Sequence, residues 1–386
     1  MSSARGVTRD VVAVFAAKGV RTFCYGYLGI LLPVYLAELG LSAWGVGASV
    51  TLTLVGSAGL TWGVRAPAER FGARMALTAL AALSVVAAVL FLVARAPWVV
   101  VLGAMLGNVA VGTGETGPFL SIEQVVIARA IAPARRTTAL SLYNLLGYGA
   151  AALGAGAAAL GTPRALFAGF LAAALVQVAA YAALGPLTMA PPARARGRST
   201  PLIRRLAALF SIDSFAGGFV VQSLVAYFLH ERFGLGLDAL GAVFLVAQLL
   251  TAASLLLAPR LASRFGLLPT MVVTHLVSNV LLMAIAAAPG AGVAVLLLFG
   301  RQLLSQIDVP TRQAYVMAVV DDHEREAAAT TTTLWRTAAQ AVSPLLTGWI
   351  MQSVAMSAPF VLGGGLKIVY DVLLYLTFKD IKPRDG

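Results

Sequence analysis

The chain consists of long apolar segments separated by short segments that carry most of its charge. Five of the apolar segments contain no charged residue at all: 44–64, 75–94, 137–163, 165–193 and 239–259. A membrane-spanning helix needs about 20 predominantly apolar residues, and each of these segments reaches that length. We therefore interpret them as transmembrane helices.

Seven further spans complete the predicted set. The region 265–300 is too long for one span and divides at Pro289-Gly290, which favours a turn. The spans that contain isolated charges are 11–37, 98–122, 206–229, 293–309, 327–353 and 359–378. The pattern thus predicts an all-α integral membrane protein with twelve transmembrane helices.

Composition supports a membrane protein and limits its chemistry. Hydrophobic residues make up 59% of the chain and charged residues only 11%, whereas soluble domains carry about 25% charged residues. A single cysteine, Cys24, excludes an internal disulfide and a multi-cysteine metal site. We expect no cleavable signal peptide, because the first apolar segment is long and ends near Glu38 without a small-residue cleavage site.

The positive charge is distributed unevenly between the two sides of the predicted membrane domain. Twenty of the 28 basic residues, Arg312 among them, fall on the N-terminal side and on the even-numbered turns. Three fall on the opposite side and five within spans. Because cytoplasmic loops carry the excess of Lys and Arg, we predict that both termini are cytoplasmic. The positive charge is spread over short loops and is not gathered into one patch. This distribution favours membrane lipids as neighbours and argues against a nucleic-acid partner.

The two halves of the chain resemble each other at an offset of 192 to 196 residues. The sequence Ala-Glu-Arg-Phe-Gly at 68–72 corresponds to Ala-Ser-Arg-Phe-Gly at 262–266. We predict a six-helix bundle over 1–190, a cytoplasmic linker over 191–203 and a second six-helix bundle over 204–386. Two halves in parallel repeat are typical of transporters that bind their substrate between the repeats.

The segment from Arg65 to Arg74, Arg-Ala-Pro-Ala-Glu-Arg-Phe-Gly-Ala-Arg, resembles the signature between helices 2 and 3 of the major facilitator superfamily, Gly-x-Leu-Ala-Asp-Arg-x-Gly-Arg-Arg. It departs from that signature at Arg65, where the family has glycine, and at Glu69, where it has aspartate. The resemblance covers the full length, and 114–124 and 306–313 are similar to a subgroup of bacterial permeases. It implies a cytoplasmic gate. The residues that the resemblance implies for this gate are Glu69, Arg70, Arg74 and Arg264.

Charges inside the spans are the main candidates for function, because each is costly unless it is paired or hydrated. The candidates for proton coupling are the acids Asp213, Glu115 and Asp308. A coupling carboxylate must gain a proton when desolvated and release it when an arginine approaches. The candidates for substrate binding are the bases Lys18, Arg21, Arg301 and Arg336. The alternative is a set of static ion pairs between helices that only stabilises the packing.

Polar and aromatic residues of the spans give further candidates for lining a cavity. These are Tyr25, Asn144, Gln222, Gln306 and Trp335. Lys367 and Asp371 are four residues apart, so we expect them to pair along one helix, and we interpret His275 as a packing residue. The Gly-x-Gly-x-x-Gly pattern at 112–117 lies inside a span, where small residues favour close helix packing. It therefore predicts no cofactor.

These features predict a secondary active transporter of the bacterial inner membrane that moves a small organic solute by alternating access. Proton-coupled efflux is the leading hypothesis, because it is common in the superfamily that the chain resembles. A carrier of an anionic metabolite, in either direction, a lipid flippase and a non-transporting receptor are the alternatives. We expect a monomer whose partners are the solute, protons and membrane lipids, with no enzyme activity, cofactor or metal.

Overall fold

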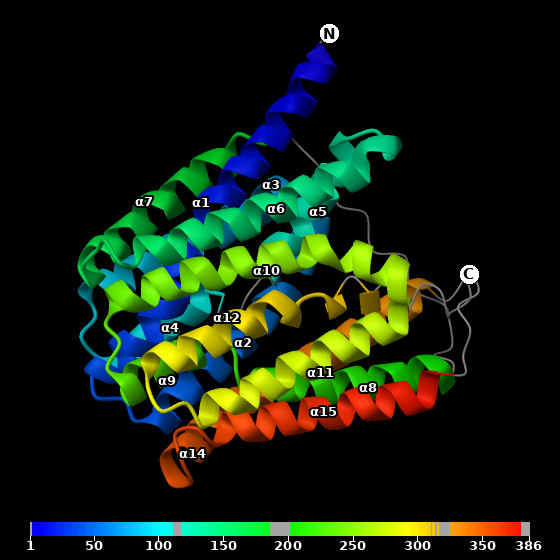
Figure 1. Cartoon of the computed structure of the whole chain (residues 1–386). Helices are drawn as coiled ribbons and strands as arrows, with labels where there is room; N and C mark the ends of the chain where they lie inside the picture. Colours follow the sequence, from blue (N-terminus) through cyan, green and yellow to red (C-terminus); the bar gives the residue numbers. More distant parts are fainter. Residues whose placement is uncertain are drawn as a thin grey trace. The chain divides into compact units, whose positions relative to one another are not determined.

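The computed structural model describes residues 2–110, 117–185, 201–309, 311–312, 315 and 325–379. Every regular element within these ranges is an α-helix (Figure 1). The first seven helices along the chain are α1 (Ser2–Glu38), α2 (Ala43–Gly63), α3 (Arg65–Val93), α4 (Pro97–Leu106), α5 (Pro118–Ala130), α6 (Pro133–Ala157) and α7 (Pro163–Ala182). The next seven are α8 (Pro201–Gly218), α9 (Gln222–Phe233), α10 (Leu237–Phe265), α11 (Leu267–Ala286), α12 (Ala291–Ser305), α14 (Arg325–Ser353) and α15 (Ala358–Phe378).

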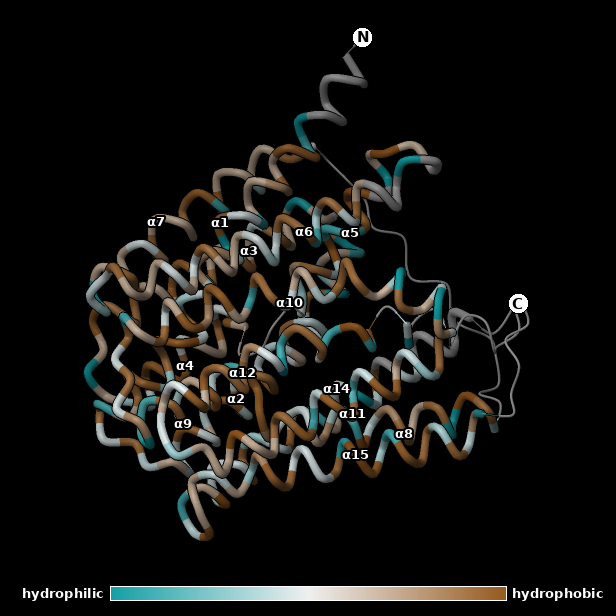
Figure 2. Tube along the Cα trace, viewed as in Figure 1, coloured by the Kyte–Doolittle hydropathy of each residue, from teal (hydrophilic) through white to brown (hydrophobic). Residues whose placement is uncertain are grey.

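Many of these helices have the length and composition of membrane spans. Eight helical segments are long and apolar enough to cross a bilayer, and three shorter apolar helices accompany them in the described part of the chain. Hydrophobic residues predominate along most of the helices, and hydrophilic ones are scattered among them (Figure 2). The prediction of an all-helical, multi-pass membrane protein is confirmed.

Three of the predicted spans are interrupted within the described residues, which the apolar pattern does not indicate. The span predicted over 293–309 is interrupted after Ser305, where α12 ends and a turn at 306–307 follows. The span predicted over 98–122 consists of α4 and α5, and α5 begins at Pro118 after Gly117, whose φ is 113°. Only glycine adopts such a φ readily, and proline has no N–H with which to continue a preceding helix. The span predicted over 206–229 consists of α8 and α9.

The break between α8 and α9 exposes backbone carbonyls that α14 satisfies. Ser343 donates to the carbonyl of Phe215 at 2.5 Å, and Thr347 donates to that of Phe219 at 3.3 Å. Inside a membrane every backbone polar group needs a partner in the protein. Hydroxyl groups of a neighbouring helix therefore allow the helix to be broken at this depth.

The chain divides into two compact units. The first comprises Met1–Ser42, Ser49–Pro192 and Leu235–Leu245, and the second comprises Ala43–Ala48, Ala193–Gly234 and Val246–Gly386. In the first unit α1 packs against α6 and α7, and α3 packs against α4 and α7. In the second, α8 packs against α14 and α15, and α11 against α12 and α15. The second set repeats the first with helices at equivalent places, as an internal parallel repeat requires.

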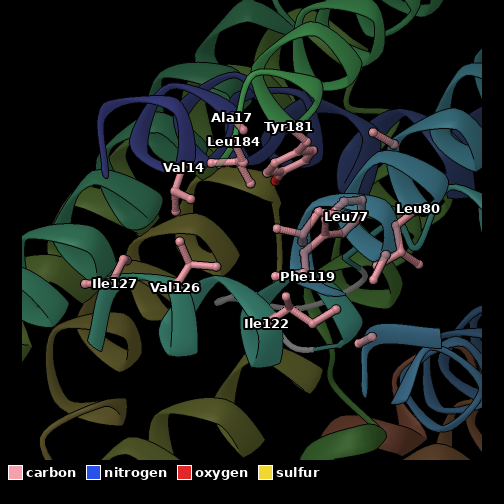
Figure 3. Close-up of a cluster of buried hydrophobic side chains, with 14 of the residues drawn as sticks. Val14, Ala17, Leu77, Leu80, Phe119, Ile122, Val126, Ile127, Tyr181 and Leu184 are labelled. Carbon is pink, nitrogen blue, oxygen red and sulfur yellow. The ribbon is translucent and has the colours of Figure 1, made fainter. Parts of the chain in front are cut away.

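Each unit has its own hydrophobic core. In the first unit, side chains from α1, α3, α5, α6 and α7 meet around Leu77, Phe119 and Tyr181 (Figure 3). In the second unit, Phe210 of α8 and Tyr370 of α15 belong to a core that also includes Met271 of α11. These cores hold the helices from which the buried polar side chains project.

Candidate functional site

Asp213 of α8 lies at the centre of a buried network of charged side chains in the second unit. Lys367 Nζ, from α15, is 2.5 Å from Asp213 Oδ1. Arg312 Nη1 is 3.3 Å from Asp213 Oδ2 and 2.6 Å from Asp308 Oδ2. The side chain of Asp213 is 6% exposed. One carboxylate thus binds two cations, and a second carboxylate binds one of them.

The network continues from Asp213 through a histidine to another acid. Nε2 of His275, on α11, is 3.5 Å from Asp213 Oδ1. Its Nδ1 is 2.7 Å from Asp371 Oδ1, and Asn279 donates from Nδ2 to Asp371 Oδ2 at 3.2 Å. Three carboxylates, the guanidinium of Arg312, the ammonium of Lys367 and one imidazole therefore form one connected network. We call Asp213, Asp308, Asp371, Arg312, Lys367 and His275 the Asp213 cluster.

Helical spacing explains how three helices contribute to this cluster. Lys367 and Asp371 are four residues apart and share one face of α15, as His275 and Asn279 do on α11. Because α15 packs against both α8 and α11, the polar residues on its face meet those of both neighbours. The three helices run side by side (Figure 1). The arrangement can hold or move a proton or bind a charged group.

Two further arginines of the second unit have neutral partners. Arg301 donates to Gln302 Oε1 at 2.8 Å, and Arg336 donates to Ser214 Oγ at 2.9 Å. Nε of Arg301 is buried and makes no hydrogen bond within the described residues. A half-buried guanidinium with neutral partners retains the capacity to bind an anion. Both residues are candidates for substrate binding from the sequence.

The buried charges of the first unit centre on an ion pair between Arg21 and Glu123. Arg21 of α1 binds Glu123 of α5, with Nη2 2.6 Å from Oε2. Tyr181 and Tyr143 each donate to Glu123 at 2.5 Å. Arg21 and Glu123 are both 0% exposed. Arg21, a substrate-binding candidate, therefore lies within the interior of its unit, and Lys18 lies 4.4 Å from the centre of the Tyr143 ring.

The two networks occupy equivalent places in the repeat with opposite charge order. In the first unit the base, Arg21, is on the first helix and the acid, Glu123, is on α5. In the second unit the acid, Asp213, is on the equivalent helix α8, and the base, Arg312, follows α12 in the chain. An ion pair thus joins corresponding helices in both halves.

The remaining candidates for lining a cavity are divided between buried and exposed positions. Tyr25 is buried and donates to the carbonyl of Gly107 at 3.0 Å. Gln222 is buried at the start of α9 and accepts from Gln248 at 3.0 Å. Gln306 ends α12, and Asn144 and Trp335 are exposed. Glu115, a candidate for proton coupling, lies outside the described residues.

The residues of the predicted cytoplasmic gate are exposed in both repeats. They are Glu69, Arg70, Arg74 and Arg264. Gly72 lies two residues after Arg70, and Gly266 lies two residues after Arg264, with φ values of 85° and 86°, a conformation that favours glycine. The Cζ atoms of Arg70 and Arg264 lie 5.2 and 5.4 Å from the centres of the next phenylalanine rings. The repeated Arg-Phe-Gly sequence therefore has the same local structure in both units.

The sequence alone missed several members of the networks. The sequence predicts Arg312 in a cytoplasmic loop, but it is 4% exposed and binds two acids. Lys367 and Asp371 were expected to bind each other, but their partners are Asp213 and His275. Glu123 is a charged residue in an apolar helix, which is a signal that could have identified it.

Comparison with known proteins identifies the fold. No family model matches the chain. An uncharacterized membrane protein of Saccharomyces cerevisiae, YJR124C, is 22% identical over 428 residues, which cover 98% of this chain and 96% of that protein. The structure of nucleoside transporter NupG matches with a TM-score of 0.77 at 14% identity and covers 96% of this chain and 99% of that one. The xylose transporter XylE from E. coli, in an inward-open conformation, matches with a TM-score of 0.73 at 15% identity, covering 97% of both chains. The chain has the major facilitator superfamily fold.

The major facilitator superfamily fold accounts for the repeat and for the pairing of equivalent helices in the two units. It is also the fold that the resemblance of the Arg65–Arg74 segment implies. No group of three or more His, Cys, Asp or Glu side chains in the described ranges could hold a metal ion. The buried polar chemistry of the described residues is thus that of ion pairs, one imidazole and hydrogen bonds.

Proposed function

We propose that the protein is a secondary active transporter that moves a small organic solute by alternating access and couples this movement to protons. The Asp213 cluster is the observation that carries the proposal. Buried charges inside a helical membrane protein are costly and mark substrate or proton pathways by default. Solved structures with the same fold include carriers of nucleosides and of xylose, and such solutes are the first candidates for this chain.

The proposed architecture has twelve transmembrane helices in two bundles, 1–190 and 204–386, joined by a cytoplasmic linker over 191–203. Both termini are cytoplasmic, and the protein is a monomer of the bacterial inner membrane that contacts lipid through its apolar faces. The excess of basic residues on one side supports this orientation. The recurrence of packing partners in the two units supports the division.

Proton-coupled efflux is the proposed mode of transport. Transport of an anionic metabolite is a second candidate, favoured by the neutral partners of Arg301 and Arg336. If the solute is an anion, Arg301→Gln and Arg336→Gln should each abolish its binding, because each removes a cation with anion-binding capacity. Arg260→Gln, at an exposed position, is the matched control and should bind as the wild type does.

A ligand screen followed by a flux assay tests the transporter proposal. Purified protein is screened by thermal unfolding against nucleosides, monosaccharides including D-xylose, and organic anions, since a ligand of the folded state raises its stability. Compounds that raise Tm are then tested for counterflow in proteoliposomes. The proposal predicts counterflow of at least one such compound. A ligand that binds without any flux would indicate a receptor, and movement of labelled lipid without a soluble solute would indicate a flippase.

A further inference from the structure

We infer that His275 binds the coupling proton, held by Asp371 on one side of the ring and exchanged with the Asp213–Lys367 pair on the other. This inference rests on the proposed function, because it names the proton site of the same transporter. The evidence is the position of one imidazole between two acids and a base, all of them buried.

Both ring nitrogens of His275 have partners. Nδ1 is 2.7 Å from Asp371 Oδ1, and Nε2 is 3.5 Å from Asp213 Oδ1 and also 3.5 Å from Lys367 Nζ. The His275 side chain is 5% exposed and that of Asp371 is 1% exposed. The imidazole therefore lies between the carboxylates of Asp213 and Asp371 and is a partner of both.

This geometry provides partners for both protonation states of the ring. In the neutral ring, Nδ1–H donates to Asp371, and the lone pair of Nε2 accepts from the ammonium of Lys367. When a proton is bound, Nε2–H donates to Asp213 and no longer accepts from Lys367. Neither state leaves a ring nitrogen without a partner, so the ring can change charge in this place.

Two acids of the cluster, Asp213 and Asp308, are less suited to carry the proton. Asp213 binds Lys367 and Arg312, and Asp308 binds Arg312. A proton on either carboxylate would remove the anion that these buried cations bind, and breaking a buried ion pair from one side is costly. A proton on His275 instead adds a positive charge beside Asp371, whose other hydrogen-bond partner in the described residues is the neutral side chain of Asn279.

The charged groups around His275 are those that a proton would affect. Asp371, Lys367 and the ring of Tyr370 face it from α15. Asp213 faces it from α8, with Arg312 beyond. On α12 the single charged residue is Arg301, whose backbone carbonyl accepts from Ser278 of α11. A proton on His275 would compete with Lys367 for Asp213. Proton binding would thereby change the contacts among α8, α11 and α15.

Nuclear magnetic resonance of histidine ring nitrogens tests the proton site without a substrate. The chain has only three histidines, so protein labelled with ¹⁵N-histidine in lipid nanodiscs gives few signals. His230→Gln and His323→Gln variants assign the remaining signal to His275. We expect this signal to show a second protonated ring nitrogen when the pH of the sample is lowered from 9 to 4. A ring that keeps one protonation state from pH 4 to pH 9 would overturn the inference.

A transport assay distinguishes failure of this inference from failure of the proposed function. His275→Gln, and Asp371→Asn as an independent variant, should retain exchange of a ligand found by the screen at equal pH on both sides. Both should lose accumulation driven by a pH gradient, whereas His230→Gln should retain it. Wild-type protein that exchanges no compound contradicts the proposed function. Full pH-driven accumulation in His275→Gln contradicts only the inference about His275.

Discussion

Two buried ion pairs, Arg21–Glu123 and Asp213–Lys367, differ in how completely they are enclosed. The first is 0% exposed and is capped by two tyrosine hydroxyls. The second belongs to a network that extends over several helices and retains a slight exposure of 9% at the Lys367 side chain. A fully buried ion pair whose acid also accepts from two neutral hydroxyls fits a role in stability, whereas a network of several acids, bases and an imidazole fits a role in moving charge.

Replacing Glu123 tests the stabilising role of the Arg21–Glu123 pair. Glu123→Gln removes the carboxylate that Arg21 binds at 2.6 Å and leaves a buried positive charge. We expect the free energy of unfolding to fall by roughly 3–5 kcal/mol, the cost of breaking a buried pair from one side. Denaturant-induced unfolding in detergent micelles measures the change. Glu69→Gln, at an exposed loop position, is the control and should unfold as the wild type does; equal stability of the two variants would contradict this role.

At the scale of the helix, glycines set how closely α1 and α6 can approach. A Cβ atom on Gly154 of α6 would collide with the backbone carbonyl of Phe23 on α1, and one on Gly26 would collide with the backbone of Ala151. A Cβ on Gly149, also on α6, would meet no atom within 4 Å. Small residues at such crossings let helix backbones pack closely in membranes.

The helix crossing gives a second prediction. Gly154→Ala should destabilise the first unit by about 1–3 kcal/mol, the usual cost of overpacking, because the colliding atom belongs to a backbone and cannot rotate away. Gly149→Ala should leave stability unchanged or slightly raised. Thermal unfolding of the two variants, made on the same helix with the same added methyl group, provides the comparison. A loss of equal size in both would contradict the role of the crossing, since helix propensity alone favours alanine over glycine.

The sequence predicts the helices far better than their partners. Apolar segments of about 20 residues must become spans in a bilayer, which is why the positions of most helices follow from the pattern. Spacing along one helix says nothing about the neighbouring helix, so Lys367 and Asp371 were expected to bind each other although α8 and α11 supply their partners. The break before Pro118 depends on a tertiary environment that accepts a positive φ at Gly117.

At the scale of the whole molecule, the distribution of basic residues predicts the orientation in the membrane. The single cysteine, Cys24, is 2% exposed and should not react with an impermeant reagent. The wild-type protein should therefore give no labelling signal of its own. New cysteines at exposed positions on either predicted side can report the orientation.

Cysteine labelling gives a third prediction. Ala355→Cys, in the exposed turn between α14 and α15, should react with a membrane-impermeant maleimide in intact cells. Ser263→Cys, exposed near the end of α10, should react only in inverted vesicles or permeabilised cells. Wild-type protein, with Cys24 alone, is the control for background reaction. Reaction of Ser263→Cys in intact cells would contradict the predicted cytoplasmic side.

Solute-driven proton movement in proteoliposomes is the most direct test of a proton-coupled transporter centred on the Asp213 cluster. A pH-sensitive dye inside the vesicles reports proton movement when a ligand found by the thermal screen is added outside. We predict a pH change in vesicles with wild-type protein and with Asp238→Asn, a control at an exposed position on α10. Asp213→Asn should fold but produce no change, because the carboxylate that binds Lys367 and Arg312 is lost. An equal pH change in Asp213→Asn vesicles would contradict the account.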